Sequence, residues 1–562
     1  MKPSLLGFII LALASAPTLL AQSPVTIQVN ATHALQPFPR LWNFFGYDEP
    51  NYTYAPNGQK LLRQIAALSP QPAYIRTHNL LTSGDGTGSM KWGSTNAYTE
   101  DASGHPVYDW KIIDRIFDTF HNSGEKPLVE IGFMPEALSI HPEPYRHNFP
   151  NGSIFTGWAY PPKDYAKWAE LVFQFVNHLR ERYGETEVNT WLWEVWNEPD
   201  IDYWKGTPEE YLKLYDYSAH AVRRALPKAI IGGPDSTGPS HPRAAEFLKA
   251  FLEHCDTGRN YATGKTGAPL DFISFHPKGA AKWTNDHVEM GLAAELNAID
   301  RGFKIVASFP RWKNTPVLLG EWDPEGCAAC SAQTHPQNGY RNSSLYAAYT
   351  VEAFSQTLAL AARDGVHLRG ALTWAFEFED QPYFAGFRAL ATQGIDKPVF
   401  NAFRMLGLLG GEQIEANSSA ALVTDQILSD GVRSAPDIRA IATRTADGVE
   451  VLVWNYHDDD LPSASVPINL TITGLPANVH RALLEHFRID STHSNSFTAW
   501  NLMGSPQSPT PEQYQQLESA GQLQLLQSPQ WIQMDNGNAH VQFDLPREGL
   551  SLIRIEGKAS GR

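Results

Sequence analysis

The stretch WLWEVWNEPD, residues 191–200, passes from a run of aromatic and aliphatic residues directly into an Asn-Glu-Pro turn. Trp191–Trp196 is short and rich in aromatic residues, which predicts a β-strand. Glu198 stands two residues beyond the end of this strand. Barrels of parallel strands carry their reacting residues at such C-terminal strand ends. The fold and the role of Glu198 therefore both depend on whether similar strands recur along the chain.

Short runs of the same kind recur from about residue 41 to residue 409 and alternate with longer segments of helical period. The predicted strands are Leu41–Phe45, Ala73–Thr77, Leu128–Gly132, Trp191–Trp196, Ile230–Gly233, Phe272–His276, Val317–Glu321 and Gly370–Phe376. The predicted helices include Trp110–Phe120, Tyr165–Tyr183, Pro208–Ala225, Ala244–Cys255 and Ser344–Ala362. Eight strands with intervening helices predict an α/β fold, the (β/α)8 or TIM barrel.

After about residue 410 the pattern changes to alternating strand-like runs separated by turn residues. These runs are Ile438–Thr445, Val449–Tyr456, Ser465–Thr473, Arg481–Ile489 and His540–Leu545. They predict an accessory all-β sandwich, with a loop and a short helix in the Gln-rich segment Gln507–Gln530. Val25–Asn30 is a lone strand with no helix after it, and we expect it to join the sandwich. The expected division is residues 1–21 signal peptide, 22–40 N-terminal strand, 41–409 barrel and 410–562 sandwich.

The composition limits the partners of this chain of 562 residues. A formal net charge of -16 argues against nucleic acid or an anionic membrane, because both are bound through clustered Lys and Arg. At the N-terminus, Lys2 precedes the apolar run Leu5–Leu20, and Ala21-Gln22 is a plausible cleavage point. The run is shorter than the roughly 20 residues that span a bilayer. We therefore expect a secreted or periplasmic protein that is not inserted in the membrane after signal removal, although an uncleaved anchor is an alternative.

The chain has three cysteines, which are too few for a disulfide framework. Cys327 and Cys330 have the spacing of a redox or half-zinc motif, but no second Cys/His pair completes a set of four ligands. A local disulfide or two free thiols are the expected alternatives. At least one cysteine of a monomer, Cys255 in the first case, must remain unpaired.

Two carboxyl groups about 5 to 5.5 Å apart are needed to cleave a glycoside through a covalent intermediate. Glu198 follows the fourth predicted strand and Glu321 ends the seventh, in Pro-Val-Leu-Leu-Gly-Glu. Both are expected to point into the mouth of the barrel. Burial would keep Glu198 protonated as the acid/base, and hydrogen-bond donors would keep Glu321 ionised as the nucleophile. The amide of Asn197 can bind the sugar 2-hydroxyl.

The chain resembles glycoside hydrolase family 39, the family of β-xylosidases and α-L-iduronidases, within the clan of retaining (β/α)8 glycosidases. The matching segments are Arg76–His78, Gly132–Pro135, Trp196–Asp200, Ile273–His276 and Trp374–Asp380. The resemblance implies that Glu198 is the acid/base, that Glu321 is the nucleophile, and that no cofactor or metal is needed. It also implies a sugar subsite lined by His78, Phe133, Asn197, His276, Trp374, Glu379 and Asp380. His276 or Trp374 as core residues, and Glu379 with Asp380 as a plain acidic loop, are the alternatives.

Lys278 departs from the xylosidase pattern, which has Tyr two positions after the strand-six His. The iduronidase branch resembles the chain better here, with a Lys implied to meet the uronate carboxylate. Lys278 paired with an acid such as Glu325 is the alternative. Ile201 stands where iduronidases carry a polar His. The first expectation is therefore an exo-acting β-D-xylosidase that acts on oligosaccharides or polysaccharides. An iduronidase-like enzyme and a non-catalytic polysaccharide-binding protein are the alternatives.

Overall fold

The computed structural model describes residues 23–147 and 154–557, and in it the barrel strands form one parallel eight-stranded sheet. The strands, in chain order, are β2 (Phe44–Tyr47), β3 (Tyr74–Thr77), β6 (Lys126–Ile131), β9 (Leu192–Val195), β10 (Ile230–Thr237), β11 (Phe272–His276), β14 (Val317–Leu319) and β15 (Leu368–Ala371). Backbone hydrogen bonds from Gly46 N to Thr373 O (3.0 Å) and from Thr373 N to Phe44 O (3.1 Å) link the first strand to the last. The sheet therefore closes, and the predicted (β/α)8 barrel is confirmed.

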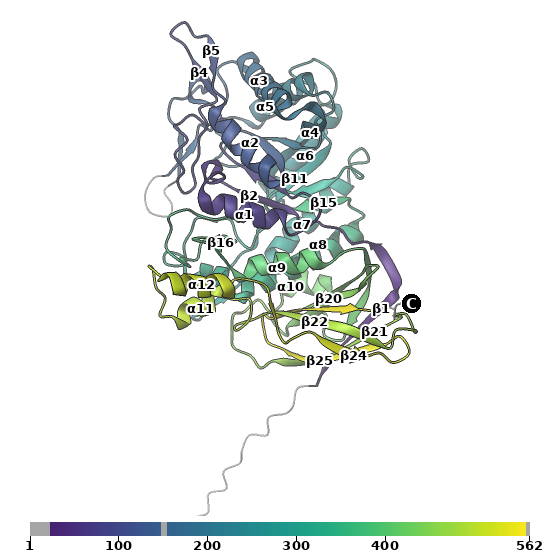
Figure 1. The fold of residues 1–562 in the computed structure, drawn as a ribbon. Helices are drawn as coiled ribbons and strands as arrows, with labels where there is room; N and C mark the ends of the chain where they lie inside the picture. Colours follow the sequence, from purple (N-terminus) through teal and green to yellow (C-terminus); the bar gives the residue numbers. More distant parts are fainter. Residues whose placement is uncertain (1–22, 148–153, 558–562) are drawn as a thin grey trace, which may run out of the picture.

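Helices surround the barrel on the outside (Figure 1). They are α1 (Pro56–Ala66), α2 (Lys111–Ser123), α3 (Tyr165–Tyr183), α5 (Pro208–Ala225), α6 (Pro242–Thr257), α7 (Leu292–Ala307), α8 (Ser344–Asp364) and α9 (Pro398–Leu408). The Asp164 carboxylate accepts from the first amides of α3, and Thr207 with Glu210 forms a capping box on α5. The inner face of α3 carries fully buried residues such as Trp168 and Phe175. Each such side chain contributes about 1.5–3 kcal/mol through burial.

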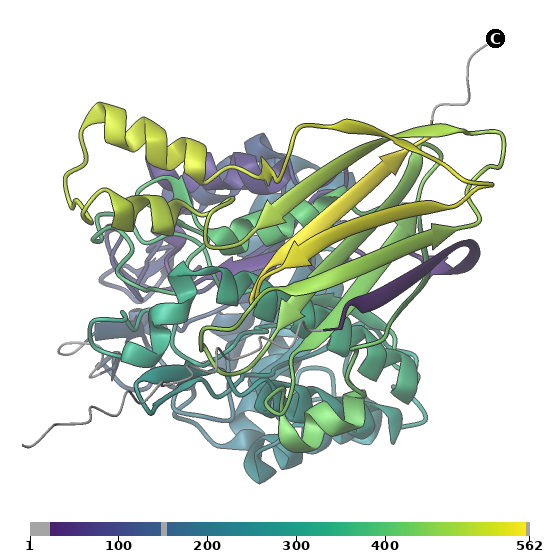
Figure 2. The same cartoon turned by 90° about the horizontal axis from the view of Figure 1, so that it is seen from below.

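The C-terminal part forms a β-sandwich, as predicted, and the N-terminal strand is built into it (Figure 2). Its main strands are β1 (Val25–Pro37), β18 (Glu412–Ser418), β19 (Asp437–Arg444), β20 (Gly448–Tyr456), β21 (Val466–Thr473), β22 (Arg481–Ile489), β25 (Ala539–Leu545) and β26 (Leu550–Glu556). Strand β1 lies between β18, to which it is antiparallel, and β21, to which it is parallel. Its alternate residues Ile27 and Val29 are buried in a core shared with Val451, Leu470 and Ile553.

The sandwich packs closely on the barrel through α8 and through a helical hairpin. Trp454 of β20 donates its indole N–H to Glu352 of α8 at 2.6 Å, and both side chains are buried. Helices α11 (Ser496–Leu502) and α12 (Pro511–Ala520) project from the sandwich, and their Trp500 and Leu517 pack on Phe384 of the loop after β15. This loop also carries Trp374 and Glu379 at its start. The sandwich therefore supports one wall of the barrel mouth.

Two cysteines close a small loop after β14, since Cys327 and Cys330 form a disulfide. Of the two alternatives expected for this pair, the disulfide is the one observed. Cys255 is free and buried. The predicted signal peptide, residues 1–21, lies outside the described residues. Within the described ranges, no helix has the length and apolar character to cross a bilayer.

Candidate active site

Glu198 is held in a strained turn directly after β9. Trp196 and Glu198 both have positive φ angles, 73° and 42°, which cost side-chain-bearing residues about 1–3 kcal/mol each. Neighbouring strands fix the turn. Trp196 N donates to Ile131 O of β6 at 3.2 Å, and Glu198 N donates to Asp235 O of β10 at 2.9 Å. The strain is therefore balanced by contacts that place the Glu198 carboxyl at the C-terminal end of the barrel.

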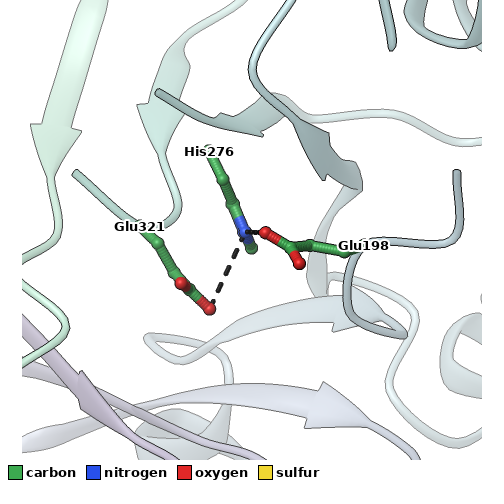
Figure 3. Close-up of side chains that lie close together, drawn as sticks. All are labelled: Glu198, His276 and Glu321. Atoms are coloured by element: carbon green, nitrogen blue, oxygen red, sulfur yellow. Dashed lines mark hydrogen bonds and ion pairs between the residues drawn. The ribbon is translucent and has the colours of Figure 1, made fainter. Parts of the chain in front are cut away.

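Glu321 reaches the same point from β14, one residue after Gly320. A Cβ at position 320 would collide with Asp235 and lie 3.0 Å from His276 Nε2, so only glycine permits this close approach. Oxygens of Glu198 and Glu321 and a ring nitrogen of His276 all lie within 4.8 Å of one another (Figure 3). The two carboxyl side chains are 13 % and 8 % exposed, so both remain open to solvent.

This separation has a direct chemical meaning. Retaining glycosidases hold their two carboxyl groups about 5–5.5 Å apart, whereas inverting enzymes need about 6.5–9.5 Å to admit a water molecule. An oxygen-to-oxygen distance no longer than 4.8 Å fits the first arrangement. Glu321 is therefore placed to attack an anomeric carbon, and Glu198 is placed to protonate its leaving oxygen.

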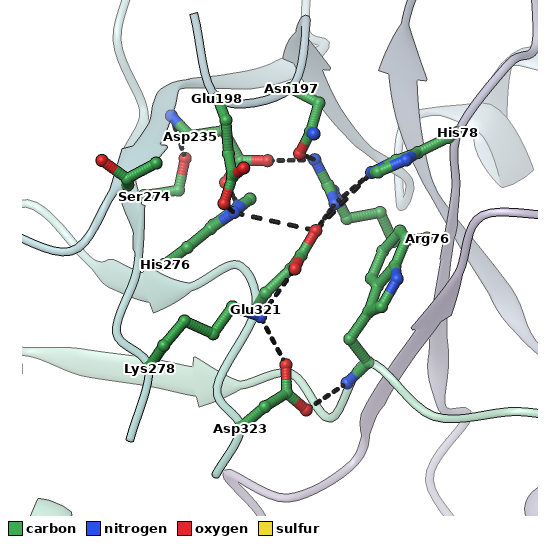
Figure 4. A network of polar contacts seen from close by, with 12 residues as sticks. Arg76, His78, Asn197, Glu198, Asp235, Ser274, His276, Lys278, Glu321 and Asp323 are labelled. Atoms are coloured by element: carbon green, nitrogen blue, oxygen red, sulfur yellow. Dashed lines mark hydrogen bonds and ion pairs between the residues drawn. The ribbon is translucent and has the colours of Figure 1, made fainter. Parts of the chain in front are cut away.

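Cations surround Glu321 and keep it ionised (Figure 4). Lys278 Nζ lies 2.6 Å from Glu321 Oε2, and Arg76 Nη1 lies 3.3 Å from Oε1. Burial by itself would raise the pKa of Glu321, but Lys278, His276, His78 and Arg76 outweigh it and hold the pKa well below its ordinary value. Glu321 is thus an anion at neutral pH, as a nucleophile must be.

His276 connects the two carboxyl groups and is itself charged. Its Nδ1 lies 3.0 Å from Glu198 Oε1, and its Nε2 forms an ion pair with Asp235 Oδ1 at 3.0 Å. Burial opposes the charge, but Asp235 and Glu321 raise the pKa of His276 to about 10. A doubly protonated ring donates from both nitrogens. His276 therefore orients the Glu198 carboxyl through this contact.

Arg76 forms the floor of the site and is fully buried. It contacts Glu194 and Asp235 directly, and its Nη2 lies 2.9 Å from Glu130 Oε2. The same Nη2 donates to Asn197 Oδ1 at 3.2 Å. Because Asn197 accepts from Arg76 with its oxygen, its NH2 group is left to donate to a ligand. The guanidinium thus binds together the ends of four barrel strands.

The other residues predicted for the sugar subsite are placed as follows. Trp374 packs against His78 with ring centroids 4.3 Å apart, and Phe133 stacks on Tyr203 at 5.9 Å. Phe133 is 2 % exposed and so supports the site from within the core. His78 Nε2 lies 3.6 Å from Glu321 Oε1. His78, Asn197, His276, Lys278 and Trp374 are thus gathered around the two glutamates.

One alternative from the sequence is wrong, and one expectation stays a prediction. Glu325 is not the partner of Lys278, because it pairs with Arg341 (2.6 Å) and Arg388 (2.7 Å) while Lys278 binds Glu321 and Asp323. Glu379 is directed to α1, where it accepts from Asn57 Nδ2 and Gly58 N, both at 3.1 Å. Among the described contacts, none joins Glu379 or its neighbour Asp380 to the two glutamates. The sugar-subsite role expected for Glu379 and Asp380 therefore stays a prediction.

Several residues of the cluster were not singled out from the sequence. Asp48, directly after β2, forms an ion pair with His78 Nδ1 at 2.9 Å and accepts from Lys91 Nζ at 3.1 Å. Asp235 lies in β10, and Asp323 stands two residues after Glu321. An acid at a predicted strand end was a signal available for all three. Lys91 lies in a long loop without periodic pattern and offered no such signal.

Glu198, His276 and Glu321 also lie close enough together to hold a metal ion. A metal-binding histidine must be neutral, whereas the acids around His276 raise its pKa to about 10. Lys278 and Arg76 moreover already contact both oxygens of Glu321. The donor set therefore fits a sugar better than a metal.

Comparisons with known proteins agree with this geometry. The chain is 29 % identical over 459 residues to a β-xylosidase of Caldicellulosiruptor saccharolyticus, covering 79 % of this chain and 82 % of that protein. It is 27 % identical over 537 residues to the α-L-iduronidase of Mus musculus, covering 90 % and 77 %. A monomeric β-xylosidase from Caulobacter crescentus CB15 shares the fold, with a TM-score of 0.73, 23 % identity and coverage of 95 % and 99 %. The model of glycosyl hydrolases family 39 matches residues 25–529. The chain therefore belongs to glycosyl hydrolases family 39.

Proposed function

We propose that the protein is a retaining, exo-acting β-D-xylosidase that releases xylose from xylo-oligosaccharides by double displacement. The approach of Glu198 and Glu321 to within 4.8 Å carries this proposal. Glu321 attacks C1 while Glu198 protonates the departing oxygen. Glu198 then removes a proton from water, which attacks C1 and releases both the sugar and Glu321. No step needs a cofactor.

Two observations favour xylose. The relatives named β-xylosidase, from Caldicellulosiruptor saccharolyticus and Geobacillus stearothermophilus, are 29 % and 28 % identical to the chain over most of its length. Lys278, the cation expected to bind a uronate, already has two carboxylate partners at 2.6 Å, Glu321 and Asp323. A third carboxylate would have to compete with both. A neutral sugar meets no such competition.

Exo action is supported by the low exposure of the reacting groups. The carboxyl side chains of Glu198 and Glu321 are only 13 % and 8 % exposed, and the side chain of Lys278 is 17 % exposed. A long polysaccharide must pass through an open cleft, whereas a terminal sugar can enter a confined pocket.

An α-L-iduronidase-like activity is the second candidate, because the α-L-iduronidase of Mus musculus aligns over 90 % of the chain and Lys278 lies beside the nucleophile.

Secretion is part of the proposal as well, on the strength of the apolar run Leu5–Leu20. Sequencing the N-terminus of protein recovered from the culture medium or periplasm tests secretion. A start at Gln22 supports it, and a start at Met1 contradicts it.

Aryl glycosides of xylose, arabinose, galactose, glucuronate and iduronate test the substrate. We expect the β-xyloside to give the highest kcat/KM and proton NMR to detect the β-anomer of xylose first. Preference for a uronide, lost selectively in Lys278→Ala, would favour the second candidate. Binding of xylan without hydrolysis of any glycoside would favour a non-catalytic role.

A further inference from the structure

Asp48 and Lys91 form a buried ion pair beside the two glutamates, and the proposed mechanism does not use it. Lys91 Nζ lies 3.1 and 3.2 Å from the two oxygens of Asp48. Asp48 also forms an ion pair with His78 Nδ1 at 2.9 Å and accepts from the indole N–H of Trp374 at 3.3 Å. Because His78 and Trp374 already belong to the wall of the site, the pair is built into the same wall.

The position of Lys91 is fixed by its own backbone. Its φ angle is 63°, in the left-handed region that Lys rarely adopts, and its amide donates to Glu49 at 2.5 Å. Three residues further on, Ser94 exchanges two hydrogen bonds with Asn51, both at 2.9 Å. The loop is thus clamped to the segment after β2, and a buried ammonium is held in one place.

The ammonium keeps hydrogen-bonding capacity for a ligand. A lysine has three N–H donors, and the hydrogen bonds that Lys91 Nζ makes within the described residues both go to Asp48. The Lys91 side chain is 10 % exposed and that of Asp48 is 4 % exposed, so the pair is largely withdrawn from bulk solvent. Among the described contacts, at least one donor of the ammonium is therefore left for a ligand.

The groups that interact electrostatically with Lys91 indicate where the substrate would lie. Burial lowers the pKa of Lys91, but interactions with Asp48, Tyr203 and Glu321 outweigh this effect and raise the pKa above its ordinary value. The side chain is therefore a cation. Tyr203 in turn interacts with Asp48, Glu198 and Glu321 as well as with Lys91. The pair and the two glutamates therefore border the same volume. One imidazole ring, His78, separates Asp48 from Glu321, a span comparable to a pyranose ring.

We propose that Asp48 and Lys91 bind two adjacent hydroxyl groups of the sugar at the end remote from C1, the 3- and 4-hydroxyls. The carboxylate accepts from one hydroxyl and the ammonium donates to the other. Glu379, an acid that the resemblance implied for the sugar subsite, accepts from Asn57 and Gly58 of α1. The inference rests on the proposed function, since it takes C1 to face Glu321.

Deoxy substrates test the contact. Lys91→Met and Asp48→Asn are compared with the wild type on an aryl β-xyloside and on its 3-deoxy and 4-deoxy analogues. A hydrogen bond to a charged group predicts a loss of kcat/KM of about 10- to 100-fold on the parent substrate. On the analogue that lacks the contacted hydroxyl, the same substitution should cost less than about threefold. Equal losses on all three substrates, or no loss on any, would overturn the inference.

A matched control and a second measurement separate the possible failures. Lys126→Met removes a lysine that pairs with Glu187 at the start of β6, at the opposite end of the barrel, and should keep wild-type activity. If Lys91→Met does not fold, as judged by its melting curve, Asp48→Asn carries the test. Calorimetry with free xylose and 4-deoxyxylose tests the contact without turnover. A wild-type chain that hydrolyses no glycoside refutes the proposed function, and xylose binding that is unchanged in both variants, or absent throughout, refutes the hydroxyl contact.

Discussion

Lys278 Nζ lies 2.6 Å from Glu321 Oε2, so that a charged lysine contacts the proposed nucleophile directly. The ammonium also contacts Asp323 at 2.6 Å, which fixes its position. Burial opposes ionisation of Glu321, and Lys278 is the largest of the influences that lower its pKa. The availability of the nucleophile at acidic pH thus depends on a neighbouring residue.

Removing this cation should move the acid limb of the pH–rate profile. In Lys278→Met the pKa of Glu321 rises, so Glu321 is protonated and inactive at a higher pH than in the wild type. We expect the acid limb of kcat/KM to shift upward by about one pH unit or more. Lys282→Met, which removes an exposed lysine of the same segment, should leave the limb unchanged. Superimposable profiles for Lys278→Met and wild type would contradict the assignment.

Arg76 should be essential for stability, because it neutralises several buried acids at once. Arg76→Met leaves these carboxylates without a partner, which predicts a loss of about 3–5 kcal/mol in the free energy of unfolding. Denaturant titration measures it. The part-exposed pair of Arg182 and Asp118 provides a control, for which Arg182→Met should cost about 0–1 kcal/mol. Similar losses in the two variants would argue against a buried charge cluster.

The raised pKa of His276 predicts that the fold loses stability at alkaline pH. Its pKa is raised to about 10 in the folded chain, mainly by Asp235 and Glu321 against the effect of burial. A group whose pKa is raised on folding stabilises the fold fully below its unfolded pKa of about 6.5, and this contribution is lost as the pH rises to about 10. The melting temperature should fall over this range, and less steeply in His276→Gln. Parallel curves for the two proteins would show that His276 stays neutral.

The cysteines give a simple check of the loop after Glu321. Cys327 and Cys330 are bridged and Cys255 is buried, so a thiol reagent should find no reactive thiol in the folded protein. One thiol should react after unfolding without reductant. Three reactive thiols would mean that the bridge is absent.

The barrel could be predicted because each strand is a local pattern. The structure contains all eight predicted strands, with ends shifted by a few residues: Leu41–Phe45 became Phe44–Tyr47, and Gly370–Phe376 became Leu368–Ala371. Phe376 lies beyond the end of β15, where its ring stacks on Tyr47 and its backbone pairs with Ala389. Such boundaries depend on packing between distant segments, which periodicity does not encode.

Site residues that end a strand could be predicted from the sequence. Site residues that meet only through contacts between loops could not. Glu198, His276 and Glu321 follow or end barrel strands, so topology alone brings them together. Asp48 and Lys91 meet across 43 residues because two irregular loops are clamped to each other. The position of Glu379 depends on a hydrogen bond to an amide of α1, which no local pattern indicates.

The most direct test of the central claim is to trap the covalent intermediate. The enzyme is incubated with an activated 2-deoxy-2-fluoro-β-xyloside, and the protein and its peptides are weighed by mass spectrometry. We predict the addition of one fluorosugar per chain, on the peptide that contains Glu321, and no addition in Glu321→Gln. Labelling of another residue, or rapid hydrolysis of the parent xyloside with inversion at C1, would contradict Glu321 as the nucleophile of a retaining enzyme.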